Sequence, residues 1–297
     1  MKNTDAFSHY HPIVNFIYFA LVLFFAMIFM HPACLIVSLV CAIAYAVSLK
    51  GRKAALFSLK FMLPVLLLTV IVNPAFNHAG QTMLLYLPNG NPITKESIAY
   101  GFAAGAMLAG VLMWFYCVTE VLSSDKFVYL FGRISPALSL ILSMTLRFVP
   151  RFKVQLDAVK QARRSIGRDG AVGSVLKRCR EAVTVMSIMI TWSLENAIDT
   201  ADSMKSRGYG SGRRSSFSIY RFGRRDKMLL IWILLCGAII FAAAFLGGLS
   251  WRYFPNIRGS SGALTCCAVC AYFALCITPT AINLKEERRW KSMLCKI

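Results

Sequence analysis

Residues 228–249 read MLLIWILLCGAIIFAAAFLGGL and contain no charged side chain. A helix needs about 20 mostly apolar residues to cross the hydrocarbon core of a bilayer. This stretch has that length, and its composition therefore predicts a transmembrane helix. Five further, mostly apolar stretches predict five more spans: His11–Met30, Ala33–Leu49, Ala55–Val72, Ser97–Val118 and Gly262–Ile282.

The composition of the whole chain agrees with these spans. Of its 297 residues, 57% are hydrophobic, and the apolar residues come in long blocks. Such a chain is typical of an all-α integral membrane protein. We expect about six transmembrane helices in two groups, residues 1–120 and 228–297, separated by a third region, residues 121–227. Ser135–Val149 is apolar but short for a span, and predicts a half-helix whose depth stays open.

The net charge of +20, from 33 basic and 13 acidic residues, predicts an orientation. Short cytoplasmic loops of membrane proteins carry an excess of Lys and Arg. Twenty basic residues lie in 121–227, five lie in Lys285–Lys296, and a short loop reads Lys50-Gly51-Arg52-Lys53. We therefore expect a multi-pass protein of the cell membrane with both termini in the cytoplasm.

The ten cysteines and four histidines do not form a metal-binding pattern. Most cysteines lie in apolar spans, and Cys267-Ala-Val-Cys270 has no second pair, histidine or carboxylate beside it. We expect these thiols to pack as small apolar groups, with no metal and no cofactor bound. Paired carboxylates or a nucleophile with its base are also missing, and this argues against an enzyme.

Two amphipathic helices are predicted within residues 121–227. Leu146-Arg147-Phe148-Val149-Pro150 is expected to close the apolar half-helix with a charge and a helix breaker. Apolar residues then recur every three or four positions. The first helix presents Phe152, Leu156, Val159, Ala162 and Ile166, and ends at Gly167 and Gly170. The second runs from about Val175 to Ser206 and presents Met186, Ile190, Leu194, Ala197, Ile198, Ala201 and Met204.

The second helix has a defined end at Ser206-Arg207-Gly208. A cation in the last turn lies at the negative end of the helix dipole, and a following glycine can adopt the left-handed cap. Arg207 is therefore expected at a helix tip. Residues 75–97 form an external loop whose end, Thr94, is expected to cap the fourth span.

The pattern alone also allows two other roles for residues 121–227. Amphipathic helices beside a bilayer often pack on the protein's own spans or lie at the headgroup surface. A basic segment such as Arg213–Lys227 is most often an anchor for anionic lipid. A partner-docking role is the third possibility that composition leaves open.

The combination of elements resembles the transmembrane coupling component of energy-coupling factor transporters, the CbiQ-like family. The resemblance is carried by the apolar spans, by Leu146–Pro150, by the two amphipathic helices and by Ala201-Asp-Ser-Met-Lys-Ser-Arg-Gly-Tyr209. That family has an Ala-Arg-Gly-like tripeptide at the end of each coupling helix. Ser206-Arg207-Gly208 matches the second tripeptide well.

The first tripeptide is a poor match. The family's usual distance from the proline places it at Ser165-Ile166-Gly167, where an isoleucine stands in place of arginine. In this register Arg164 or Arg168 supplies any cationic contact, or the helix docks by apolar packing. A shift by two residues would give Arg163-Arg164-Ser165 instead, but we favour the unshifted register because it keeps the glycine.

The resemblance implies a non-catalytic subunit of an ATP-driven importer. Its coupling helices are expected to dock on two cytoplasmic ATPases, which hydrolyse the ATP, and to hold a small membrane protein that captures a vitamin-like micronutrient. Arg147 and Pro150 are expected to form a structural element before the coupling helices. A stand-alone secondary transporter is the main alternative, although Lys60 is the one ionisable residue well inside a predicted span. A protein with a lipid-binding basic surface is another.

Overall fold

The computed structural model describes residues 5–77, 79–86, 92–167, 174–212 and 220–294. The chain forms two compact units. Unit 1 comprises Met1–Ser123 and Tyr220–Ile297, and unit 2 comprises Ser124–Ile219. Each unit is helical, and two short hairpins belong to unit 1.

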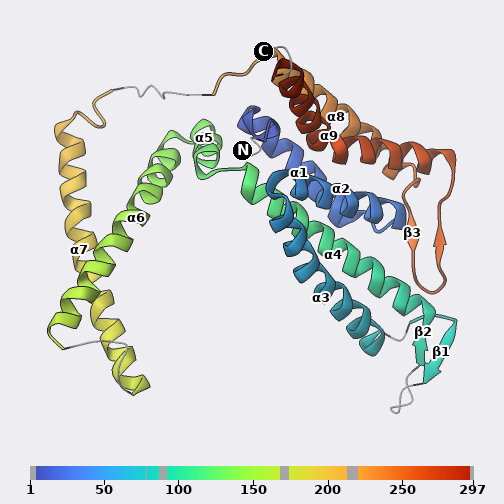
Figure 1. Cartoon of the computed structure of the whole chain (residues 1–297), viewed down its shortest axis with the longest axis horizontal. Helices are drawn as coiled ribbons and strands as arrows, with labels where there is room; N and C mark the ends of the chain where they lie inside the picture. The colour runs from blue at the N-terminus through green and yellow to red at the C-terminus, as the bar shows by residue number, and fades with distance from the viewer. Residues whose placement is uncertain (1–4, 78, 87–91, 168–173, 213–219, 295–297) are drawn as a thin grey trace. The chain divides into compact units, whose positions relative to one another are not determined.

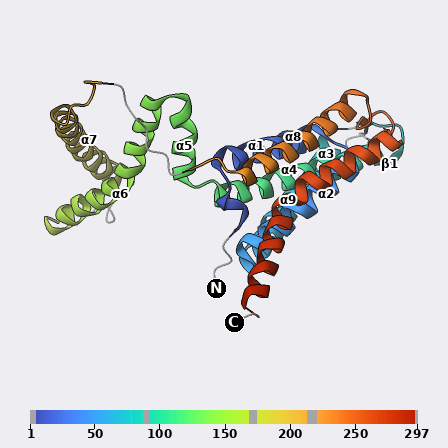
Figure 2. The ribbon, with the colours of Figure 1, turned by 90° about the horizontal axis from the view of Figure 1, so that it is seen from above.

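Unit 1 contains six apolar helices (Figures 1 and 2). Their bounds are α1 Pro12–Ile28, α2 Pro32–Lys50, α3 Arg52–Phe76, α4 Lys95–Val121, α8 Arg224–Phe245 and α9 Ala263–Leu294, and a 3-10 turn, η1, covers Phe7–His9. Four of them are long and apolar enough to span a membrane, namely α2, α4, α8 and the Ala263–Met293 part of α9. The apolar parts of the other two, Pro12–Ile28 and Lys60–Phe76, are shorter. Each of the six predicted spans overlaps one of these six helices, and the chain is an all-α membrane protein as predicted.

The core of unit 1 is aromatic. Tyr18 of α1 and Trp114 of α4 are fully buried, with ring centroids 6.3 Å apart. Trp114 Nε1 donates to Ser38 Oγ of α2 at 3.0 Å, which satisfies the indole in an apolar interior. Phe7 of η1 is also fully buried, 5.1 Å from the Tyr18 ring. The segment before α1 is therefore part of the bundle.

Close helix contact between α3 and α4 depends on two glycines. A Cβ on Gly105 would lie 2.3 Å from Thr69 Oγ1, and a Cβ on Gly101 would lie 3.2 Å from the Thr69 carbonyl oxygen. Gly101 and Gly105 are four residues apart and so share one face of α4. Small residues at this spacing let two membrane helices approach at backbone distance.

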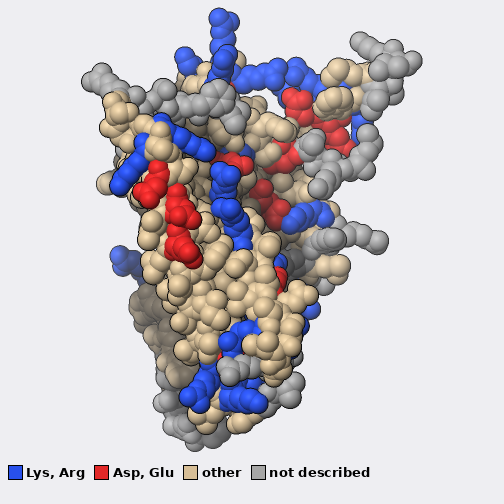
Figure 3. Space-filling model, turned by 90° about the vertical axis from the view of Figure 1, so that its left-hand side faces the viewer, with Lys and Arg blue, Asp and Glu red and all other residues tan. Residues whose placement is uncertain are grey.

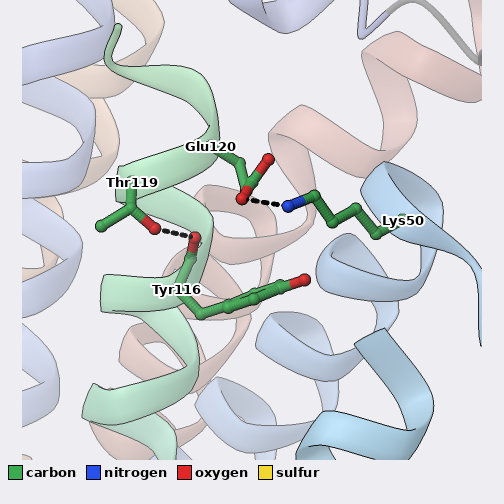
Figure 4. A network of polar contacts seen from close by, with 4 residues as sticks. All are labelled: Lys50, Tyr116, Thr119 and Glu120. Atoms are coloured by element: carbon green, nitrogen blue, oxygen red, sulfur yellow. Dashed lines mark hydrogen bonds and ion pairs between the residues drawn. The ribbon is translucent and has the colours of Figure 1, made fainter. Parts of the chain in front are cut away.

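The two ends of helix α4 are held by different contacts. Strands β1 Met83–Tyr86 and β2 Pro92–Thr94 form one antiparallel hairpin, and β3 Trp251–Arg252 and β4 Arg258–Gly259 form another. Thr94 Oγ1 accepts from Ser97 N at 3.3 Å, which confirms the predicted cap of α4. At the far end of α4, Glu120 forms an ion pair with Lys50 of α2, whose Nζ lies 5.7 Å from the Tyr116 ring centroid (Figure 4).

Unit 2 consists of α5 Ser124–Ile134, α6 Pro136–Ser165 and α7 Val175–Ser206. The predicted second amphipathic helix is confirmed with the bounds expected. The prediction that Pro150 ends an apolar half-helix was wrong, because α6 runs through it without interruption. A proline removes one backbone hydrogen bond, and here the helical residues on both sides keep the rest of the ladder. Ser135–Val149 and the predicted first amphipathic helix are therefore one element.

The basic residues that follow the last predicted span, which were expected as a C-terminal tail, are part of a longer helix as far as Leu294. The span expected over Gly262–Ile282 continues as α9 through Leu294. Helix α5 was not predicted from the sequence.

Candidate functional site

Unit 2 is built on the crossing of α6 and α7 (Figure 1). The Phe152 ring of α6 lies edge-on to the Trp192 ring of α7, with centroids 5.4 Å apart. Further along, Arg163 of α6 pairs with Glu181 of α7, and both side chains are more than four-fifths buried. The helices run antiparallel, because the contact closer to the end of α6 is closer to the start of α7.

Helix α7 ends in a complete Schellman cap. Gly208 has φ of +79°, the left-handed region that glycine adopts without strain. Its N–H donates to the Lys205 carbonyl at 2.9 Å, and the Tyr209 N–H donates to the Met204 carbonyl at 3.1 Å. These two bonds satisfy the carbonyls that the last turn leaves open. Arg207, immediately before the glycine, is thereby held at the helix tip, as predicted.

Helix α6 ends in the same backbone conformation. Gly167 has φ of +75°, and its N–H donates to the Arg164 carbonyl at 3.0 Å. The residue before the glycine is Ile166, with φ −96° and ψ 16°, compared with φ −83° and ψ 6° at Arg207. Ser165-Ile166-Gly167 and Ser206-Arg207-Gly208 are therefore equivalent in backbone geometry. The glycine that favoured the unshifted register also forms the helix cap.

The two tips differ in their central side chain. Ile166 is 69% exposed, so the end of α6 presents an apolar group where the end of α7 presents a guanidinium. Among the described residues, no hydrogen bond or ion pair engages the Arg207 side chain. Arg163, part of the alternative register, is engaged by Glu181. Arg164 is exposed to solvent. Arg168 and Gly170 lie outside the described residues.

The tips lie far from each other along the two helices. From Phe152 to Gly167 and from Trp192 to Arg207 the chain advances by about 22 Å at 1.5 Å per residue. Because the helices are antiparallel and cross, these two distances run in different directions from the crossing (Figure 1). Unit 2 thus presents two similar helix ends at two separate places.

The face of α7 that turns away from α6 is apolar and exposed. No residue of α7 is buried. The half-buried positions, among them Glu181, Met189 and Trp192, share the side toward α6. On the opposite side lies an apolar stripe, each member more than half exposed: Val183, Met186, Ile190, Leu194 and Ile198. The predicted apolar face of this helix is therefore uncovered by the rest of unit 2.

The charged side chains of unit 2 are unevenly distributed. Basic residues gather where α6 ends and α7 begins, and uncharged surface adjoins them (Figure 3). They are Arg163, Arg164, Lys177, Arg178 and Arg180. Acidic residues Glu195, Asp199 and Asp202 follow nearer the end of α7.

Arg147 and Pro150 lie within α6, one turn apart, and both are exposed. They belong to the same helix that carries the Ile166 tip, and not to a separate element before it. In the described part of the chain there is no group of three or more His, Cys, Asp or Glu that could hold a metal ion. The nine cysteines described there are free thiols, five of them buried.

The two contacts that join α6 to α7 were not predicted from the sequence. In each contact, the partner on α7 stands out in the sequence. Glu181 is the one acidic residue in the first half of that helix, among three basic residues, and Trp192 is the one tryptophan of residues 121–227. Their partners on α6 could not be chosen without the crossing geometry.

Comparison with known proteins places this architecture among transport proteins. The model of the cobalt transport protein family, CbiQ, matches residues 8–219. A protein from Staphylococcus aureus named energy-coupling factor transporter transmembrane protein EcfT is 23% identical over 269 residues, covering 83% of this chain and all of the relative.

Two relatives of the same name extend the comparison. The Bacillus selenitireducens protein is 30% identical over 112 residues, covering 37% of this chain and 42% of the relative. The Listeria innocua protein is 24% identical over 239 residues, covering 75% of this chain and 88% of the relative. The match thus spans about two-fifths of the Bacillus selenitireducens protein, and nearly the whole length of the other two relatives.

Proposed function

Because the chain belongs to the cobalt transport protein family, CbiQ, we propose that it is the transmembrane coupling subunit of an energy-coupling factor importer. In this role it binds no cofactor and hydrolyses no ATP. It joins two cytoplasmic ATPase subunits to a separate small membrane protein that captures a vitamin-like micronutrient. The observation that carries the proposal is the pair of equivalent helix tips at the ends of α6 and α7.

Two ATPases need two docking points of similar shape. The tips of α6 and α7 have the same left-handed glycine cap and lie at separate places on unit 2. At the α7 tip, the Arg207 guanidinium can form two parallel hydrogen bonds with a carboxylate in a groove of one ATPase. At the α6 tip, Ile166 docks mainly by apolar packing, and Arg164 lies two residues before it in the sequence.

The apolar stripe of α7 is the surface for the substrate-binding membrane protein. Exposed side chains of Met186, Ile190 and Leu194 need a hydrophobic partner, because a stripe of this size is costly to leave in water. Since α7 carries both the stripe and the Arg207 tip, movement of an ATPase at the tip moves the stripe. This rigid link transmits closure of the ATPase pair to the substrate-binding protein.

The orientation of the chain follows from the same role. The ATPases are cytoplasmic, so unit 2 lies in the cytoplasm, in agreement with its twenty basic residues between 121 and 227. Both termini then lie on the same side of the cell membrane. Asp5 supports this arrangement, because its carboxylate accepts from Asn283 Nδ2 of α9 at 2.5 Å and so joins the two ends of unit 1.

The proposal is tested by purifying the chain together with its ATPases. Arg207→Glu reverses the charge at the α7 tip and is expected to abolish co-purification of the ATPase that docks there, since truncating a desolvated charged pair costs about 2–5 kcal/mol. Lys153→Glu makes the same charge change on an exposed residue of α6 away from both tips, and is expected to retain both ATPases. If the Arg207→Glu complex survives with both ATPases, the assignment of this tip is wrong.

A further inference from the structure

The end of α9 carries a groove that the coupling role does not use. The groove has a volume of about 530 Å³ and is open at the surface of unit 1. Its lining residues recur every three or four positions and so share one face of the helix. They are Ala281, Leu284, Lys285, Arg288, Arg289 and Ser292.

The chemistry of this face changes along the helix axis. Ala281 and Leu284, next to the apolar span, are hydrocarbon, and Leu284 is 49% exposed. Lys285, Arg288 and Arg289 follow within the next one and a half turns and are cationic. A phospholipid has the same order from bilayer core to surface, with acyl chain first and phosphate second.

The cations of the groove are only partly paired with carboxylates among the described residues. Among the described residues no ion pair engages Lys285 or Arg288, and Arg289 approaches Glu286 only to 3.9 Å. Lys291, which is not among the lining residues, is paired with Glu287 at 2.9 Å. Of the three lining cations, Lys285 and Arg288 thus have no ion pair with a described residue, and Arg289 has one long one.

The helix holds this groove in a fixed position on unit 1. Asn283, between Ala281 and Lys285, donates to Asp5 Oδ1 at 2.5 Å and accepts from Phe7 N at 3.2 Å. Trp290, 63% exposed just beyond Arg289, is a residue type enriched where a membrane meets water.

We propose that this face of α9 binds one anionic phospholipid. Arg288, Arg289 and Lys285 hold its phosphate, and Leu284 and Ala281 lie along the start of an acyl chain. Arginine suits this role because its planar fork donates two hydrogen bonds to phosphate. The apolar half of the groove selects a lipid over free phosphate, which has nothing to place against Leu284. This site is independent of ATPase docking at the tips of α6 and α7.

The test uses the full chain purified in detergent and titrated with phosphatidylglycerol or phosphatidylcholine, with bound lipid counted by native mass spectrometry. The variant Arg288→Gln/Arg289→Gln is expected to bind about thirtyfold less phosphatidylglycerol, because two basic residues are lost and each contributes on the order of 1 kcal/mol at a membrane surface. Lys291→Gln, which removes a paired cation outside the groove, is the matched control and is expected to bind as the parent chain does.

Two further measurements separate the lipid from other anions. Leu284→Gln is expected to lower phosphatidylglycerol binding several-fold. It is expected to leave the thermal stability of the chain unchanged, because Leu284 is half exposed. Inorganic phosphate at millimolar concentration is expected not to displace the lipid. Equal losses for Lys291→Gln and the double arginine variant, no loss in either, or displacement by inorganic phosphate would each overturn the proposal.

Discussion

Unit 1 and unit 2 use their apolar residues in opposite ways. Unit 1 surrounds an aromatic core, in which Tyr18 and Trp114 have no exposed surface. In unit 2, α7 has 32 residues and none of them is buried. Unit 1 is stabilised by its own packing, whereas the apolar stripe of α7 is left uncovered by the rest of unit 2, and under our proposal it is available to a partner protein. The following substitutions, from the largest expected effect to the smallest, test this contrast.

The ion pair between α6 and α7 is the exception within unit 2. Arg163→Ala leaves the Glu181 carboxylate buried and unpaired, and is expected to destabilise the crossing by about 3 kcal/mol. Hydrogen exchange of the α6 and α7 amides measures the loss. The double variant Arg163→Ala/Glu181→Ala is expected to cost less than Arg163→Ala alone, since no charge is then stranded. Equal protection in the parent chain and Arg163→Ala would show that the pair does not stabilise unit 2.

Helix packing in unit 1 is tested by adding a single methyl group. Gly105→Ala is expected to destabilise the chain by about 2 kcal/mol, because its Cβ would lie 2.3 Å from Thr69 Oγ1. That hydroxyl cannot move cheaply, as it donates to the Val65 and Leu66 carbonyls.

The control for Gly105 is Gly110→Ala in the same helix. Its Cβ would meet Ser38 Oγ at 3.8 Å, an ordinary contact, and alanine favours helix over glycine. Thermal unfolding in detergent is expected to show a lower midpoint for the first variant and an equal or higher midpoint for the second. The reverse order would contradict close packing of α3 on α4.

The glycine cap of α7 is tested by a β-branched substitution. Gly208→Val forces valine to φ of +79°, a strain of about 1–2 kcal/mol, and is expected to weaken ATPase retention roughly tenfold by deforming the tip. Gly212→Val is the matched control, because Gly212 has no positive φ and open space around its Cβ position. Co-purification with increasing amounts of the ATPase measures its retention by both variants. Equal retention of the ATPase by Gly208→Val and Gly212→Val would mean that the geometry of the cap does not matter for docking.

The smallest expected effect on stability is at the apolar stripe. Ile190→Ser removes an exposed side chain and is expected to change the stability of the isolated chain by less than about 0.5 kcal/mol. The same change in unit 1, Ile233→Ser, removes a side chain with no exposed surface and is expected to cost about 3 kcal/mol. Ile190→Ser is nevertheless expected to weaken binding of the substrate-binding membrane protein, measured by pull-down. A large loss of stability in Ile190→Ser would mean that the stripe packs within the chain.

Much of this architecture could be predicted because single-helix signals are local. Apolar length located the six helices of unit 1, and the glycines after Ile166 and Arg207 located the two tips. The helix end predicted at Pro150 was wrong. A proline in the sequence indicates one lost backbone hydrogen bond, but it does not show whether the flanking residues keep the helix intact. The pairing of Arg163 with Glu181 depends on how two helices cross, and spacing along one chain carries no information about that angle.

The central claim is that the tips of α6 and α7 each contact one ATPase. Photo-crosslinking measures this most directly, with a benzophenone amino acid placed at Ile166 or at Ser206, which leaves Arg207 in place, and with Val149 on α6 as the control position. Both tip positions are expected to crosslink to ATPase subunits in the assembled transporter, and Val149 is not. Absence of an ATPase crosslink from both tips, with crosslinks from the control position, would contradict the account.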